Sequence, residues 1–295
     1  MAIPFILIPI GGFILNEYYQ NKKIKEVQER IESIKHAHEK NLERFNLERE
    51  NTIKSLDSLE RKRLEIFGSF KIFSELVETV VGRPQLTKKI NNVNLKLDNL
   101  KLEELKIVSF KSIELLDKIN SVGTMSGLFL GEKALLSLSG LGIGALGVST
   151  LGIGAIISTN IKTIKRYSDA KKADASYEKM KESEKIIIKC CNYFAILEKV
   201  IKDFKYCINK INDVYIIHFD QLKNIIHNKK NFDDFTAEEK LIFGNTVLLV
   251  QLLLNILKVK FFLEKKNEEG LQEINVLDIN ESITTSDDIL KDIKY

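Results

Sequence analysis

The sequence predicts an all-α protein, an elongated antiparallel bundle of coiled-coil-like helices that carries a glycine-rich hydrophobic hairpin. Only 3 of the 295 residues are proline, and charged residues make up 29% of the chain. Apolar residues recur at helical spacing through most of its length. This composition is typical of long helices, whereas β architectures need many turns, so we exclude an all-β fold. With 44% hydrophobic residues, the chain has enough apolar side chains for a substantial core.

Residues 1–16 form an apolar N-terminal segment that contains Pro4 and Pro9. Its apolar stretch is shorter than the roughly 20 residues that a membrane-spanning helix needs. Lysines follow this segment instead of preceding it, so we expect no cleavable signal peptide of the usual kind. The segment is interpreted as a membrane anchor or interfacial segment, or as a tail packed on the bundle. A cleaved peptide is a third alternative.

Residues 17–120 are predicted to form a long amphipathic helix and a second helical segment. The first part, residues 17–81, contains no proline and one glycine, and its apolar residues fall three and four positions apart. Gly82-Arg-Pro84 then supplies a helix stop signal. Helical spacing returns over residues 100–120.

The strongest signal in the chain is the glycine-rich, nearly uncharged segment 121–161. Within it, residues 134–161 form a run of 28 without a charged side chain, which is long enough to cross a membrane. Small residues four apart let helices approach closely in lipid. We therefore predict a membrane-insertion hairpin. The glycines assigned to insertion are Gly123, Gly127, Gly131, Gly140, Gly142, Gly144, Gly147, Gly152 and Gly154.

A bend in this segment follows from its length. As one straight helix, residues 134–161 would extend roughly 42 Å, more than the roughly 30 Å hydrocarbon core of a bilayer. The natural turn is 139–142, although Glu132 and Lys133 make the first arm a poor span on its own. The alternative is a small-residue hairpin buried inside a bundle.

A basic cluster follows the hairpin directly and is opposed only by Asp169. Basic residues beside an apolar segment favour an anionic membrane surface. We therefore predict that the cluster binds lipid headgroups. Its members are Lys162, Lys165, Arg166, Lys171 and Lys172.

Residues 162–230 are predicted to form a long heptad-patterned helix. Twelve positions step alternately by three and four residues, which is a specific coiled-coil-like pattern and predicts a buried seam. These positions are Ile187, Cys190, Phe194, Leu197, Ile201, Phe204, Ile208, Ile211, Tyr215, His218, Leu222 and Ile225.

The last two segments differ sharply in composition. Residues 231–263 are predicted to be a capped apolar helix, because Thr236 and Glu239 have the spacing of a capping box. Its uncharged part, residues 241–257, is interpreted as a buried bundle helix or as a membrane span. Residues 264–295 hold nine acidic and four basic residues, and we expect a loosely attached acidic tail.

No constellation of residues indicates an enzyme, a cofactor or a metal site. Gly142, Gly144 and Gly147 match the literal dinucleotide-binding pattern, but the strand and acidic residue that this motif needs are missing. His38 and His218 fall in apolar seams. They are interpreted as core histidines or, alternatively, as switches that respond to protonation. Three cysteines within one helical stretch suggest no disulfide framework, and so a reducing cytoplasm as the place of synthesis. We expect neither a nucleic-acid partner nor a small-molecule substrate.

Over residues 17–228, the order of parts resembles α-helical pore-forming toxins and the apolipoprotein L type of membrane-inserting protein. The resemblance rests on a long amphipathic helix, a glycine-rich hairpin from Gly123 to Gly154, and a second long amphipathic helix. It implies a membrane-associated, non-enzymatic protein that inserts its hairpin and forms a homo-oligomer to permeabilise a lipid membrane. A bacterial toxin and an intracellular defence effector both fit. The alternative is a membrane-anchored helical scaffold or tether that binds partner proteins.

Overall fold

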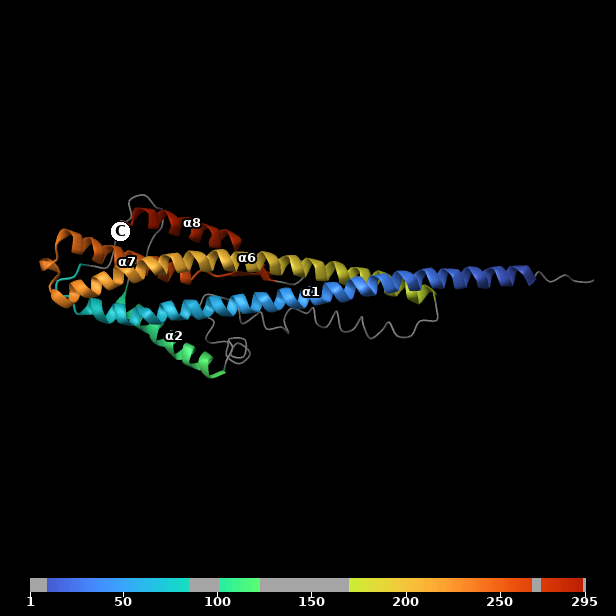
Figure 1. The fold of residues 1–295 in the computed structure, drawn as a ribbon, viewed down its shortest axis with the longest axis horizontal. Coiled ribbons are helices and arrows are strands. Elements are labelled where there is room, and N and C mark those ends of the chain that lie inside the picture. Colours follow the sequence, from blue (N-terminus) through green and yellow to red (C-terminus); the bar gives the residue numbers. More distant parts are fainter. Residues whose placement is uncertain (1–9, 85–100, 123–169, 267–271, 294–295) are drawn as a thin grey trace, which may run out of the picture. The chain divides into compact units, whose positions relative to one another are not determined.

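The computed structural model describes residues 10–84, 101–122, 170–266 and 272–293 (Figure 1). These residues form five α-helices and one two-stranded sheet, so the predicted all-α class is confirmed. In chain order the elements are α1 (Ile10–Glu78), α2 (Leu102–Val122), α6 (Ala170–Asn228), a 3-10 turn (Phe232–Asp234), α7 (Ala237–Leu257), β1 (Phe262–Lys266), β2 (Gln272–Ile274) and α8 (Val276–Asp292).

The chain divides into two units, and α1 and α6 contribute to both. The first unit comprises Met1–Glu50 and Gly152–Ala195, and the second comprises Asn51–Leu151 and Ile196–Tyr295. In the first unit, Asn41 Nδ2 donates a hydrogen bond of 2.8 Å to Glu184 Oε1. Further along both helices, the rings of Phe45 and Phe194 lie 5.7 Å apart. Residue numbers rise together in these pairs, so the two helices run parallel in this unit.

The second unit repeats this direction over a longer stretch. Lys205 Nζ donates to Ser58 Oγ at 2.5 Å, and further on the ring of Phe73 lies 6.0 Å from that of Phe219. Beyond the helix ends, Val81 forms a parallel bridge with Asn231. The backbone N–H of Val81 donates to the carbonyl of Lys230 at 2.8 Å. α1 and α6 therefore run parallel within this unit and end side by side.

The antiparallel packing predicted for the bundle holds for only some of its helix pairs. α2 runs antiparallel to α1, because Lys106 of α2 pairs with Glu78 whereas the later Ser109 bonds to the earlier Phe67. α7 runs antiparallel to α6, because Glu239 of α7 pairs with Lys229 whereas the later Thr246 bonds to the earlier His218.

The prediction is wrong for the two long helices themselves. Their contacts run in the same order along both helices, from Ser58–Lys205 to Phe73–Phe219. α2, which follows α1 in the chain and runs opposite to it, is a chain reversal that the prediction did not include.

The helix stop predicted at Gly82-Arg-Pro84 is where the long first helix ends. α1 ends at Glu78, and Gly82 adopts a φ of 69°. This left-handed conformation favours glycine because other residues meet a steric clash of Cβ there. A Cβ at Gly82 would also lie 3.2 Å from Asn231 Oδ1, so that glycine allows the close approach of the two chain segments.

The predicted seam of α6 is buried, which confirms the pattern seen in the sequence. Eleven of its twelve side chains are buried, and Ile225 is half-buried. In the second unit the seam packs through aromatic contacts. The ring of Tyr215 meets that of Phe70 edge-on at 6.2 Å, and the ring of Phe204 meets that of Phe261 at 4.9 Å. Aromatic pairs in this arrangement stabilise a core beyond the area they bury.

The predicted capping box of α7 is present. Thr236 Oγ1 accepts from the backbone N–H of Glu239 at 3.2 Å, and Glu239 Oε2 accepts from the backbone N–H of Thr236 at 2.7 Å. Among the described helices, α7 alone has the length and composition of a membrane span. However, 72% of its most apolar 18-residue stretch is buried inside the protein, as is usual for the core helix of a bundle. This burial favours the first of the two interpretations of residues 241–257.

The expected loose tail is wrong for most of residues 264–295. β1 pairs antiparallel with β2, and α8 follows with Ile279 and Ile289 fully buried. Lys210 Nζ of α6 also lies 2.6 Å from Asp287 Oδ1 of α8. The acidic composition obscured a helical apolar period in this segment, and this period places one face of α8 in the core.

Candidate functional site

Most of the site residues predicted from sequence lie outside the described residues. This holds for all nine glycines from Gly123 to Gly154 and for Lys162, Lys165 and Arg166. Lys171 and Lys172 lie in the first turn of α6, but their side chains are outside the described set. Residues 1–9 are also outside it. The candidate site is therefore built from α2, which leads directly into the glycine-rich segment, and from the part of α1 in the same unit.

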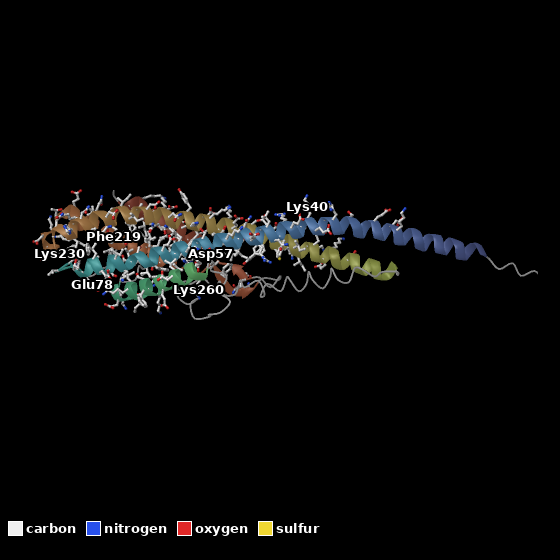
Figure 2. The ribbon with its side chains drawn as sticks, turned by 60° about the horizontal axis from the view of Figure 1, so that its bottom comes forward. Lys40, Asp57, Glu78, Phe219, Lys230 and Lys260 are labelled. Carbon is white, nitrogen blue, oxygen red and sulfur yellow. The ribbon has the colours of Figure 1, made fainter. Side chains whose placement is uncertain are left out.

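Charged contacts hold the N-terminal end of α2. Glu103 and Glu104 lie in its first turn, where the helix dipole favours acidic residues. Lys106 Nζ lies 2.5 Å from Glu78 Oε1 near the end of α1, and Figure 2 shows Glu78 beside α2. The hydrogen bond to Glu78 raises the pKa of Lys106. Lys258, at the end of α7, contacts Glu104 Oε1 at 2.7 Å. These pairs are partly exposed, so each stabilises α2 only modestly.

Small polar side chains form much of the contact between α2 and α1. Ser109 Oγ donates to the backbone carbonyl of Phe67 at 2.7 Å and is fully buried. Ser112 is also buried. On α1, a Cβ at Gly68 would lie 3.4 Å from Ile113 Cγ1, so glycine leaves room for α2 to pack closely. Leu105, four residues before Ser109 on α2, is fully buried as well.

The opposite side of α2 exposes large apolar side chains. Phe110 is 69% exposed, Ile107 55% and Ile113 37%, and on α1 Ile72 is 58% exposed. We call Ile107 and Phe110 the outer face of α2, and Ile113 lies at its edge, because its Cγ1 also faces Gly68 of α1. A surface helix usually buries its apolar side and exposes its polar side. In α2, two serines are buried and a phenylalanine is exposed. The sequence-based prediction did not include this face. The spacing could have indicated it, because Ile107 and Phe110 fall outside the series of apolar residues at helical spacing that begins at Leu105.

A buried ion pair lies in the part of α1 that belongs to the second unit. Glu60 and Arg63 are 1% and 0% exposed, and Arg63 Nη1 lies 3.4 Å from Glu60 Oε1. Burial raises the pKa of Glu60 to about 7, although the neighbouring Arg63 lowers it in part. Burial also lowers the pKa of the Arg63 guanidinium. Desolvation therefore outweighs the attraction between the two charges at Glu60, as often happens for buried ion pairs.

The described residues offer little for nucleophilic or metal chemistry. Cys190, Cys191 and Cys207 are buried free thiols. Burial raises the pKa of Cys191, and it raises that of Cys207 to about 11. Because the thiolate is the reactive form, these two thiols are poor nucleophiles at neutral pH. Within the described ranges, no group of three or more His, Cys, Asp and Glu side chains is placed to hold a metal ion.

Comparison with protein families, with curated proteins and with solved structures finds no match to this chain. A functional conclusion therefore rests on the physical properties of the sequence and of the described helices.

Proposed function

We propose that the protein is a non-enzymatic, membrane-active protein. It inserts the glycine-rich hairpin 121–161 into a lipid bilayer and forms a homo-oligomer that permeabilises the membrane. The observation that carries this proposal is the run of 28 uncharged residues in 134–161. Such a run exceeds the length of about 20 residues that spans a bilayer.

The packing of the described helices supports this proposal. In the second unit, the apolar side chains of α1 and α6 already contact one another, as in the pair Phe70–Tyr215, and Phe204 of α6 contacts Phe261, which follows α7. α7, the other apolar segment of membrane-spanning length, is largely buried in the same unit. The apolar sides by which these helices meet are thus occupied within the unit, which favours a bilayer as the partner of the hairpin.

Substitution of hairpin glycines by leucine is expected to abolish most of the permeabilising activity. Gly140→Leu, Gly144→Leu and Gly147→Leu add side chains that prevent close helix approach in lipid. Dye release from liposomes measures the effect, with Gly270→Leu as the control outside the hairpin. If circular dichroism shows intact variants that release dye like the wild type, insertion through this hairpin is refuted.

Reversing the charge of the basic cluster is expected to weaken binding to anionic vesicles strongly. Each lysine or arginine contributes about 1 kcal/mol at an anionic surface, and salt screens this attraction. We expect Lys162→Glu, Lys165→Glu and Arg166→Glu together to leave binding to neutral vesicles nearly unchanged. Co-sedimentation at low and high salt tests this, because the advantage of the wild type must disappear in high salt. Equal binding at low salt would remove the cluster from the mechanism.

The second candidate function is a membrane-anchored scaffold or tether. The lengths of α1 and α6, 69 and 59 residues, favour it, because long helices offer extended surfaces for partner proteins. In this case the hairpin is a permanent anchor. The liposome assay separates the two functions, since a scaffold binds vesicles and releases no dye.

A further inference from the structure

We propose that the outer face of α2 binds the lipid surface when the protein is on a membrane, with Phe110 in the acyl-chain boundary. This inference rests on the proposed function, because it names a second membrane contact beside the hairpin. It assigns α2 a role of its own, as an interfacial helix that lies in the plane of the bilayer.

α2 exposes large apolar side chains although it buries two serines. Phe110 is 69% exposed and Ile107 55%, whereas Ser109 is buried against α1 and Ser112 is also buried. Transfer of large apolar side chains from water to an apolar medium is favourable in proportion to their area. The outer face therefore gains from any apolar surface that covers it, and it is accessible without rearrangement of the contact between α2 and α1.

The position of α2 along the chain identifies lipid as the partner of the outer face. α2 ends at Val122, and the nearly uncharged segment follows from residue 123. Phe110 precedes Val122 by twelve residues, which is about 18 Å along a helix. If the next segment enters a bilayer, the C-terminal end of α2 lies at the bilayer surface. Interfacial helices bury their apolar side about 5–10 Å into the boundary between headgroups and acyl chains.

The charges around the outer face predict how it binds. Glu103, Lys111 and Glu114 are exposed on α2, so both signs are present beside Phe110. This mixture gives no strong attraction to anionic lipid. We therefore expect the contact of the outer face to be apolar and insensitive to salt, unlike that of the basic cluster.

The test places a fluorescent probe on the outer face. The three native cysteines are buried, so a polarity-sensitive maleimide dye will react preferentially with Phe110→Cys, and labelled wild type gives the background. The matched control is Tyr206→Cys on α6, a 73% exposed aromatic position in the same unit. Vesicles are made of phosphatidylcholine and phosphatidylglycerol, with or without bromine on the acyl chains. We expect a severalfold rise in fluorescence at position 110, quenched by the brominated lipid, and no change at position 206.

The outcomes separate this inference from the proposed function. Unchanged fluorescence at position 110 on vesicles that release their dye would overturn lipid binding by α2 and leave permeabilisation intact. A rise that brominated lipid does not quench would also overturn it, because another protein copy would then cover the face. Quenching without dye release would support the inference and refute permeabilisation. Failure of the full-length protein to bind these vesicles would refute both.

A second variant guards against effects of the dye itself. The unlabelled double variant Ile107→Ser/Phe110→Ser keeps the buried side of α2 and is expected to retain the helical content of the wild type. We expect it to bind vesicles several times more weakly at both low and high salt. Binding equal to that of the wild type would contradict a lipid contact of this face.

Discussion

Arg63→Met alone is expected to destabilise the second unit by about 3–5 kcal/mol at pH 8, the cost of leaving a buried partner charge uncompensated. Arg63 Nη1 lies 3.4 Å from Glu60 Oε1, and both side chains are fully buried. Without the guanidinium, the Glu60 carboxylate must either stay charged in the core or take up a proton. Urea unfolding monitored by circular dichroism measures this change in the free energy of unfolding.

The pH dependence of this variant follows from the sign of the pKa shift. Burial raises the pKa of Glu60 from 4.5 to about 7, so the folded protein binds this proton more tightly than the unfolded chain does. The stabilising contribution of Glu60 is therefore present below about pH 4.5 and is lost as the pH rises through 7. For the wild type it amounts to about 3 kcal/mol over this window. Removing the positive charge raises the pKa further, so that Arg63→Met regains much of its stability at pH 5.5.

The matched control is the double variant Glu60→Met/Arg63→Met. Replacing a buried ion pair by apolar side chains of similar volume is often neutral or stabilising by about 1–4 kcal/mol. We expect the double variant to be at least as stable as the wild type at pH 8 and to lack the pH dependence due to Glu60. A double variant less stable than the wild type at pH 8 would show that the pair is net stabilising.

The second large effect concerns the seam of α6, where Phe204→Ala is expected to cost about 3–5 kcal/mol of unfolding free energy. Phe204 is fully buried and packs edge-on against Phe261 at 4.9 Å. Truncation loses the free energy gained by burying the ring, and it also loses the contacts that the ring makes with its neighbours. The same urea titration measures the loss.

Tyr206→Ala provides the control for this substitution on the same helix. Tyr206 lies two residues later and is 73% exposed, so its removal leaves no cavity. We expect a change within about 0.5 kcal/mol, as is usual for surface positions. Equal losses for Phe204→Ala and Tyr206→Ala would show that the seam is not the stabilising contact of this unit.

Sequence periodicity predicted which face of a helix is buried, but it could not predict in which direction the helix runs. The three-and-four spacing from Ile187 to Leu222 correctly marks buried positions, because burial depends on the angle around one helix axis. The same spacing is satisfied by a parallel or an antiparallel partner. That direction depends on how the chain connects the two long helices, which the spacing within either helix does not record.

Composition and charge were poorer guides than periodicity at the C-terminus and in α1. The excess of acidic residues after position 264 suggested a tail, yet Ile279 and Ile289 are buried by the helical period of α8. The Glu60–Arg63 pair was also missed, because an acidic and a basic residue three apart usually lie on an exposed helix surface. Both cases depend on what covers the helix, which is a tertiary property. The predicted membrane-binding glycines and lysines remain predictions.

The parallel course of α1 and α6 has a consequence for how the chain folds during synthesis. The hydrogen bond between Ser58 and Lys205 joins residues 147 positions apart, and α1 cannot bury its seam against α6 until the ribosome has made both. At about 5–20 residues per second, translation of that interval takes on the order of ten seconds. During this time Phe70 and Phe73 lack their partners, Tyr215 and Phe219. Contacts so distant in sequence also slow folding relative to helical bundles with short connections. The nascent α1 is therefore a natural substrate for chaperones that hold apolar helices until their partners emerge.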